Sequence, residues 1–343
     1  LEHKMKSRIK IVVIFLLFSS ISIAVNPWGF YAHKKANRYA VFTLPEELIG
    51  FYKKHIDYLS EHAVDADKRR YAVKEEAPRH YIDIDHYGQN PFEVMPRKWT
   101  DAVEKFSEDT LLAYGIVPWH IQTIYNRLVS AFQQKDIDYI LKNSADLGHY
   151  VADSHVPLHT TLNYNGQLTG QKGIHAFWES RLPELFSEDY DYLLGTAEYK
   201  FSVLDVAWQA IEGSFNALDS VLGFEKQLSE EYEQDKQYAY EQRGTQTIKV
   251  KSAEFSAAYH SKLDGMVERR LRLSIATIGD LWYSAWIDAG QPILEGMQAS
   301  KNPFTEEIKI DIKITKEDPG LVGDVVLDPT NISIIAFTVF ANS

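Results

Sequence analysis

The 343-residue sequence predicts an all-α fold, a bundle of many helices followed by a short β-rich appendage. Through most of the chain the apolar residues recur at the spacing of a helix. The pattern changes after Pro303, where isoleucines alternate with charged residues from Ile308 to Ile314, as in a β-strand. We therefore divide the mature chain into a helical body, residues 25–300, and a C-terminal β appendage, residues 301–343.

The N-terminus has the pattern of a secretory signal peptide. Three basic residues between Lys6 and Lys10 precede an apolar run, Ile11–Phe18, which is followed by small residues typical of a cleavage site. We expect residues 1–24 to be removed on export, which makes the protein secreted or periplasmic. Residues 1–4 precede a methionine and look like a remnant of an expression vector or a misassigned start. The apolar run is too short for a transmembrane helix, and we expect no transmembrane segment in the mature chain.

The composition excludes several kinds of site and partner. The chain has no cysteine, which excludes disulfides, thiolate ligands and a lipid-modified cysteine. Any metal must therefore be bound by His, Asp, Glu or backbone atoms. The formal net charge is −12, and removal of residues 1–24, with four Lys/Arg and one Glu, makes it −15. So acidic a protein has no general attraction for nucleic acid or anionic membranes.

Apolar periodicity and capping residues set the expected helices. Thr43 is an N-cap candidate with Pro45 in the first turn after it, and Asp136 or Asp138 lies near the start of a later helix. Pro183 is expected to follow the end of another. In chain order, the expected helices span 28–41, 43–60, 99–112, 118–134, 136–154, 172–182, 202–222 and 253–288.

The remaining segments of the body are less regular. Segments 61–71 and 78–86 are short and polar, so we expect loops that carry many potential metal ligands. Segment 225–251 is rich in Glu, Gln, Lys and Tyr, which indicates a solvated helix or an excursion from the body. The aromatic run at 281–286 is expected to pack in the core.

Two pairs of potential ligands organise the sequence. His149 and Asp153 are four residues apart, as are His175 and Glu179, so each pair shares one face of a helix. A proline at 157 ends the first helix and turns His159 back toward the same point. One such pair is usually a solvated or capping contact. Two pairs joined by a turned histidine favour a metal site, and zinc accepts His nitrogen and carboxylate oxygen.

A longer ordered set of residues resembles a known family. Trp28 with His33 five residues later, an Asp-rich turn, the run His80-Tyr-Ile-Asp83 and the two pairs occur in one order. This order is similar to that of the zinc-dependent phospholipase C and single-strand-specific zinc nuclease superfamily, and it covers residues 28–292. The resemblance implies a helical fold with two or three zinc ions in one cleft.

The resemblance also implies which residues bind each ion. It assigns the first ion to Asp67, His80, His149 and Asp153, the second ion to His159, His175 and Glu179, and the third ion to Trp28, His33 and Asp153. Several cations in one cleft can bind a phosphate, deprotonate a bridging water and stabilise the leaving oxygen. We therefore expect hydrolysis of phosphodiester bonds by a zinc-bridging hydroxide.

The resemblance implies roles for a few neighbouring residues. Asp67 and Asp153 would be the catalytic carboxylates, since Asp67 could accept the proton of the bridging water and Asp153 is shared between ions. Arg70, Tyr81 and Asp83 would face the substrate. Asp65 competes with Asp67 for one ligand position, and the spacing to Arg70 favours Asp67.

The N-terminus departs from the family pattern. In the family the tryptophan is the first residue of the mature protein, and its amine and carbonyl bind zinc. Cleavage after Ala24 would leave Val25, Asn26 and Pro27 ahead of Trp28, whose nitrogen would then be an amide. A third ion therefore depends on further trimming.

The sequence favours a phospholipase C-like substrate, with a nuclease as the alternative. Glu rather than Asp at 179, a short loop between His159 and His175, and the acidic charge favour a phospholipid head group. The Trp28 to His33 spacing and the His-Tyr-Ile-Asp run are nuclease-like. A non-catalytic surface protein stabilised by zinc is a third alternative. No stable protein partner is evident.

The other histidines have simpler interpretations. His86 and His155 are expected close to the ligands, where they could support them. Surface or core roles are expected for His55, His62, His120 and His260.

Overall fold

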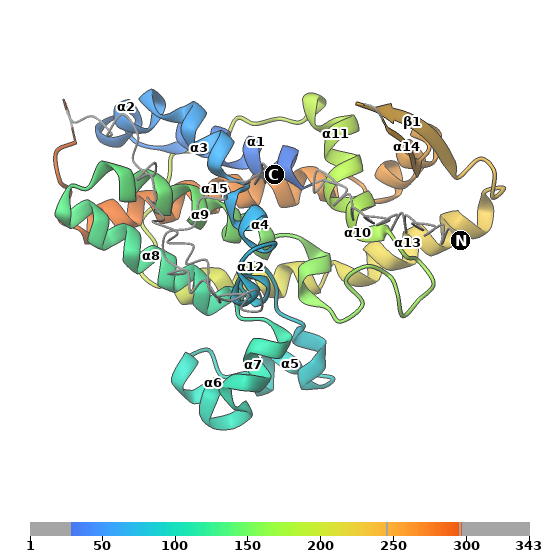
Figure 1. Ribbon diagram of the computed structural model, residues 1–343, viewed down its shortest axis with the longest axis horizontal. Coiled ribbons are helices and arrows are strands. Elements are labelled where there is room, and N and C mark those ends of the chain that lie inside the picture. The colour runs from blue at the N-terminus through green and yellow to red at the C-terminus, as the bar shows by residue number, and fades with distance from the viewer. Residues whose placement is uncertain (1–28, 245, 295, 297–343) are drawn as a thin grey trace, which may run out of the picture.

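The computed structural model describes residues 29–244, 246–294 and 296, and this part of the chain is all α, as predicted. Three long helices pack along one another: α8 (Val117–Gln134), α9 (Ile137–Ser154) and α15 (Met266–Asp288). Helix α1 (Phe30–Ala40) lies against both α9 and α15. Figure 1 shows this bundle with two additions, a small lobe of α5 (Pro91–Val94), α6 (Trp99–Phe106) and α7 (Glu108–Tyr114) on one side and a β-hairpin at one end.

Shorter helices complete the bundle. They are α2 (Glu46–Lys54), α3 (Ile56–His62), α4 (Asp65–Arg69), α5 (Pro91–Val94), α6 (Trp99–Phe106), α7 (Glu108–Tyr114), α10 (Ile174–Ala176), α11 (Leu182–Phe186), α12 (Val203–Phe215), α13 (Leu218–Glu231) and α14 (Ala253–Lys262). A π-helical turn, Phe177–Arg181, joins α10 to α11. Short 3₁₀ turns lie at Val41–Thr43, Lys74–Arg79, Ile84–Tyr87, Pro157–Thr160 and Ser187–Asp189.

The hairpin corrects one expectation. Of the two alternatives for segment 225–251, the structure excludes a single solvated helix and shows an excursion: α13 ends at Glu231, and β1 (Tyr238–Arg243) pairs antiparallel with β2 (Gln246–Lys251). Gly244, with φ of 58°, supplies the left-handed backbone of the turn. Strands were expected only beyond residue 303. The predicted signal peptide, residues 1–24, and the predicted appendage, residues 301–343, lie outside the described residues.

Several expected helices are divided in the structure. The helix expected at 43–60 breaks at His55, and Thr43 is not its cap because the Thr43 hydroxyl donates to Ala40 O at 2.8 Å. Ser107, with φ of 68°, separates α6 from α7 and accepts from the Thr110 backbone. Segment 253–288 breaks at Gly265, with φ of 70°. Segment 202–222 likewise divides between α12 and α13.

The 61–71 and 78–86 segments are more regular than loops. The first contains α4 and the second a 3₁₀ turn, Ile84–Tyr87. Ile82 and Ile84 are fully buried, so the second segment lies inside the molecule rather than on its surface. This burial places the potential ligands of the second segment next to the bundle.

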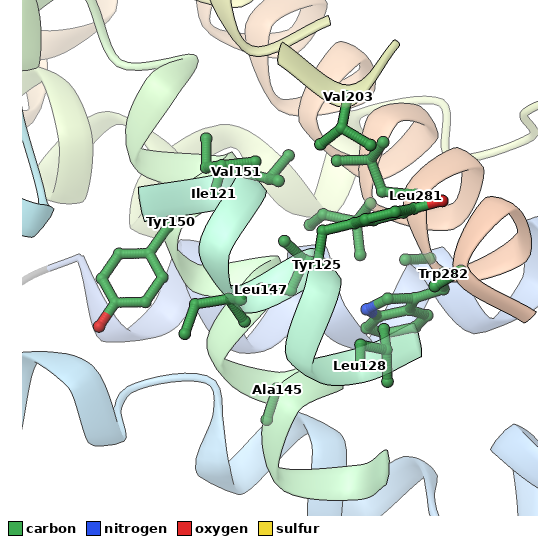
Figure 2. Packing of buried hydrophobic residues seen from close by; sticks show 14 of the residues in the cluster. Ile121, Tyr125, Leu128, Ala145, Leu147, Tyr150, Val151, Val203, Leu281 and Trp282 are labelled. Carbon is green, nitrogen blue, oxygen red and sulfur yellow. The ribbon is translucent and has the colours of Figure 1, made fainter. Parts of the chain in front are cut away.

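Two apolar clusters hold the helices together. The larger cluster joins α8, α9, α12 and α15, and Figure 2 shows Ile121 of α8 beside Val151 of α9 and Tyr125 of α8 extending toward Leu281 of α15. Trp282, fully buried as expected for the aromatic run, also donates to Ser144 O at 3.0 Å. The smaller cluster joins α10, α11, α13 and α14. Of the described helices, none is long and apolar enough to cross a bilayer.

Helix α9 is the central element, because every residue from Asn143 to Ser154 is buried. Of the two aspartates expected near its start, Asp136 is the N-cap, and its side chain accepts from the Tyr139 backbone. Asn37 of α1 fills the space above Gly148, donating to Leu59 O at 3.2 Å and to Ala145 O at 3.1 Å. A Cβ at Gly148 would overlap the Asn37 side-chain oxygen, so α1 can approach α9 closely only at a glycine.

The close approach at Gly148 gives a stability prediction. Gly148→Ala should lower the free energy of unfolding by about 1–3 kcal/mol, because the added methyl forces Asn37 out of place. Denaturant unfolding of the metal-free protein measures the change. Gly223→Ala in α13 is the matched control: nothing lies within 4 Å of its Cβ, and alanine there should stabilise by roughly 0.5–1 kcal/mol. Equal effects of the two changes would contradict the packing argument.

Candidate metal centre

Five imidazoles and three carboxylates from separate elements meet beside α9. Four overlapping groups of three have all their potential ligand atoms within 4.8 Å of one another. The groups are His80, His149 and Asp153; His33, Asp67 and His149; His159, His175 and Glu179; and His33, Asp153 and Glu179. The structure thus brings together all the predicted side-chain ligands in the described residues.

The first group surrounds one oxygen of Asp153. His80 Nδ1 lies 2.9 Å and His149 Nε2 lies 3.2 Å from Asp153 Oδ2, and the two nitrogens are 3.0 Å apart. Asp67 Oδ1 is 3.8 Å from His80 Nδ1 and 3.9 Å from His149 Nε2. A tetrahedral zinc with arms of about 2.0–2.1 Å separates its ligand atoms by roughly 3.3 Å. His80, His149 and Asp153 are therefore close enough together to share one metal ion, and Asp67 approaches the two histidines of this group.

The second group forms where the chain leaves α9. Pro157 begins a 3₁₀ turn, and His159 at its end is brought back toward the site as predicted. His175 Nε2 lies 2.6 Å and His159 Nε2 lies 3.5 Å from Glu179 Oε2. His159 Nε2 is buried without a hydrogen-bond partner, which a bound cation would supply. These residues fit a second ion.

The third group differs from the predicted one. His33 Nε2 lies 3.3 Å from Asp153 Oδ1 and 3.6 Å from Glu179 Oε1, so Glu179 joins it as well as Asp153. Gly29 lies against Glu179, and a Cβ there would overlap the carboxylate. Trp28, the other predicted ligand, lies outside the described residues.

Backbone carbonyls fix the orientation of three of the imidazoles. His149 Nδ1 donates to Ala63 O at 2.8 Å, His159 Nδ1 to the carbonyl of residue 80 at 2.7 Å, and His175 Nδ1 to Tyr164 O at 3.2 Å. Because a carbonyl can only accept, Nδ1 carries a hydrogen and Nε2 is the nitrogen that faces the cluster. In its neutral form each of these imidazoles offers the Nε2 lone pair to a metal ion.

The cluster is buried and its charges are strongly coupled. Burial would raise the pKa of Asp153, but the imidazoles of His149 and His159 hold that pKa well below its ordinary value. The pKa of Glu179 is likewise well below normal, since burial is outweighed by His175 and other imidazoles around it. Burial lowers the pKa of His159, but Asp153 and Glu179 raise it to about 9. Asp153 and Glu179 are therefore ionised, and positive charge nearby stabilises them.

The structure separates Asp67 from Asp65. Asp65, at the start of α4, accepts from Lys68 at 2.8 Å and lies 2.5 Å from His62 Nδ1. Asp67, two residues later, faces His80 and His149 instead. The expected choice of Asp67 agrees with this geometry.

The three residues expected to face substrate lie at the edge of the cluster. Tyr81 is half-buried, and Arg70 is exposed but close enough to affect the pKa of Tyr81. Asp83 is buried, and burial together with Asp85 raises its pKa to about 7 although His159 opposes the shift. Tyr164, which sequence reasoning missed, is exposed beside His175, with ring centroids 6.2 Å apart.

The two other nearby histidines do not support the ligands. His155 is buried and donates from Nδ1 to Val151 O at 2.8 Å, with its pKa lowered to about 3 by burial and by Arg270. His86 is exposed and stacks on Tyr114. Away from the cluster, His260 lies 2.8 Å from the Tyr190 hydroxyl, and His55 and His62 lie on the α2–α3 side. His120 is buried, and burial lowers its pKa to about 3.

One buried acid near the cluster was missed from the sequence. Glu76 is fully buried, and its Oε1 lies 3.7 Å from His80 Nε2. The signal was present, because Glu76 and His80 are four residues apart, as in the two pairs that revealed the site.

Comparison with known proteins does not add to this site. Neither a protein-family model nor a curated protein sequence matches the chain. The interpretation of the cluster therefore rests on its residues and their geometry.

The two neighbouring aspartates provide a test of the first group. Asp67→Asn should weaken the binding of one zinc ion by at least about tenfold, because it removes a charged ligand next to His80 and His149. Competition with a chromogenic chelator measures the affinity. Asp65→Asn, the matched control, should leave it within about threefold. An equal loss in both variants would show that Asp67 acts through the stability of α4 rather than as a ligand.

Proposed function

We propose that this protein is a zinc-dependent hydrolase of phosphodiester bonds, similar to phospholipase C, with two or three ions in the cluster beside α9. The observation that carries the proposal is the overlap of the groups: Asp153 and Glu179 each turn one oxygen toward each of two groups. Carboxylates shared in this way hold neighbouring cations close together. The proposal includes export by the predicted signal peptide, residues 1–24.

Closely spaced zinc ions would lower the pKa of bound water and neutralise charge on phosphoryl oxygens. The chain's own residues do the remaining work. Asp67, partly exposed at the edge of the first group, is placed to accept a proton from an attacking water. The carbonyl-fixed imidazoles keep the ligand geometry unchanged during turnover. With no cysteine in the chain, a thiol nucleophile is excluded.

The rim of the cluster supports a second candidate, a single-strand-specific nuclease. The exposed Tyr164 and the half-buried Tyr81 are close enough for Tyr164 to affect the pKa of Tyr81. An aromatic pair at the entrance could stack a base, and Arg70 could bind a neighbouring phosphate. The predicted mature charge of −15 opposes a long nucleic-acid track, so we rank the phospholipid head group first.

A substrate panel tests the enzyme class. The zinc-replete protein should contain at least two zinc ions per chain by elemental analysis, and it should hydrolyse bis-nitrophenyl phosphate. Relative rates on phosphatidylcholine and on single-stranded DNA decide between the two candidates. Hydrolysis of none of the three, with zinc bound, would leave the non-catalytic zinc protein as the correct alternative. Activity that survives EDTA would exclude a zinc enzyme.

Asp153 provides the sharpest single substitution. Substitution of a residue that supports a metal ligand typically costs roughly 10–100-fold in activity. Asp153→Asn should lower kcat on bis-nitrophenyl phosphate by more than this, because the Asp153 carboxylate belongs to two ligand groups. Circular dichroism must first show that the variant is folded, because loss of zinc can unfold its ligand helices. His260→Gln, which replaces an imidazole near Tyr190, should keep the parent rate. A folded Asp153→Asn variant with full activity would refute the shared-carboxylate arrangement.

A further inference from the structure

The imidazole of His80 is oriented differently from those of His149 on α9 and His159 in the 3₁₀ turn that follows α9. His149 and His159 face the cluster with Nε2, and their Nδ1 atoms donate to backbone carbonyls. His80 faces the cluster with Nδ1, and its Nε2 is buried without a hydrogen-bond partner. A buried N–H without a partner is costly, so a residue that can accept from Nε2 is needed.

Glu76 lies where that acceptor is needed. It is fully buried, it precedes His80 by one helical step, and its Oε1 is 3.7 Å from His80 Nε2, just beyond hydrogen-bond distance. Among the described residues, His80 is the one proposed metal ligand that Glu76 approaches; its other polar partners are Arg69, Arg79 and Tyr150.

A set of donors holds the Glu76 carboxylate in place. Arg79 donates to Oε2 at 2.6 Å, Arg69 approaches Oε1 at 3.4 Å, and the Tyr150 hydroxyl donates to Oε1. Burial would raise the pKa of Glu76, but the interactions with His80 and these donors lower it well below its ordinary value. Two guanidinium groups therefore surround the buried carboxylate and balance a negative charge on it.

The same network joins the three elements that carry the first ligand group. Arg69 follows Asp67 on α4, Glu76 precedes His80 by four residues, and Tyr150 follows His149 on α9. Arg69 also donates to Asp146 of α9 at 3.0 Å, and to Tyr150 at 3.2 Å. Each partner lies one or a few residues from a ligand, and Glu76 is the member of the network that approaches a ligand nitrogen, His80 Nε2.

We propose that Glu76 is a positioning residue for His80: it accepts the Nε2 hydrogen and so directs the Nδ1 lone pair to the ion held with Asp67, His149 and Asp153. A carboxylate on the outer nitrogen also makes the imidazole a stronger ligand. This inference rests on the metal centre proposed above. It predicts an effect on metal affinity that is separate from the stability of the fold.

The test compares two substitutions in one network. Glu76→Gln removes the negative charge and one acceptor oxygen facing His80, whereas Asp146→Asn removes a negative charge that contacts Arg69. Zinc affinity is measured by competition with a chromogenic chelator, and the cobalt-substituted protein reports ligand geometry by its absorption spectrum. Glu76→Gln should weaken one zinc ion by about 10–100-fold and change the cobalt spectrum. Asp146→Asn should stay within about threefold with an unchanged spectrum.

The melting temperature of the metal-free protein separates positioning from stability. If both variants lower it equally and zinc affinity is unchanged, Glu76 is merely structural and the inference is wrong. If Glu76→Gln does not fold, Tyr150→Phe replaces it, because it removes one donor to Glu76 and keeps the carboxylate. Tyr150→Phe should then weaken zinc more than Asp146→Asn does, and an equal effect would overturn the inference.

The outcomes for the parent protein distinguish this inference from the proposed function. Parent protein that binds zinc but hydrolyses no phosphodiester would refute the enzyme, while a Glu76→Gln loss of zinc affinity would still support the positioning role. Parent protein that binds no zinc would refute both. Unchanged zinc affinity in a folded Glu76→Gln variant would refute the positioning role alone.

Discussion

The burial of Asp153 and Glu179 among imidazole rings is the constraint on which the rest of the structure depends. Asp153 is 1% exposed and Glu179 is 8% exposed, and each touches two groups of the cluster. Removing a carboxylate from water costs several kcal/mol unless positive charge and hydrogen bonds compensate it. Here His33 approaches both carboxylates, and His80, His149, His159 and His175 complete the surroundings. The imidazoles supply this compensation, and the proposed cations would add to it.

The frame that holds the carboxylates is apolar and tightly packed. One cluster of side chains fixes α8, α12 and α15 against α9, and the second fixes the segment that carries Glu179. The C-terminal end of α9 receives a further constraint, because Arg270 of α15 donates to His155 O at 2.9 Å and to Ala210 O at 2.9 Å. This buried guanidinium ties three helices together just beyond Asp153.

The β-hairpin also holds the segment that carries Glu179, from outside the helical bundle. Glu179 lies in the π-helical turn Phe177–Arg181, which offers the cluster a carboxylate and places the buried Arg181 to pair with Glu241 of β1. π-helical turns are rare and recur at functional sites. Arg243 of β1 pairs with Glu184 on α11 at 2.7 Å. A segment that departs from the helical pattern thus anchors the helix of a candidate ligand.

The sequence by itself determined the helical class, the core role of Trp282 and the candidate ligands around His149 and His175. These features depend on spacing within one element: 3.6 residues a turn decides which side chains share a face, and a proline decides where His159 turns back. The family resemblance extended this local information to Asp67.

Only the tertiary structure decided which faces meet. It placed Asp67 rather than Asp65 against the histidines, brought Glu179 to His33, and buried Glu76 beside His80. It also paired β1 with β2 in a hairpin, and ion pairs hold β1 against the π-helical turn and α11. Such contacts join residues up to about 150 positions apart, and spacing along one helix carries no information about them, because they depend on how whole elements pack.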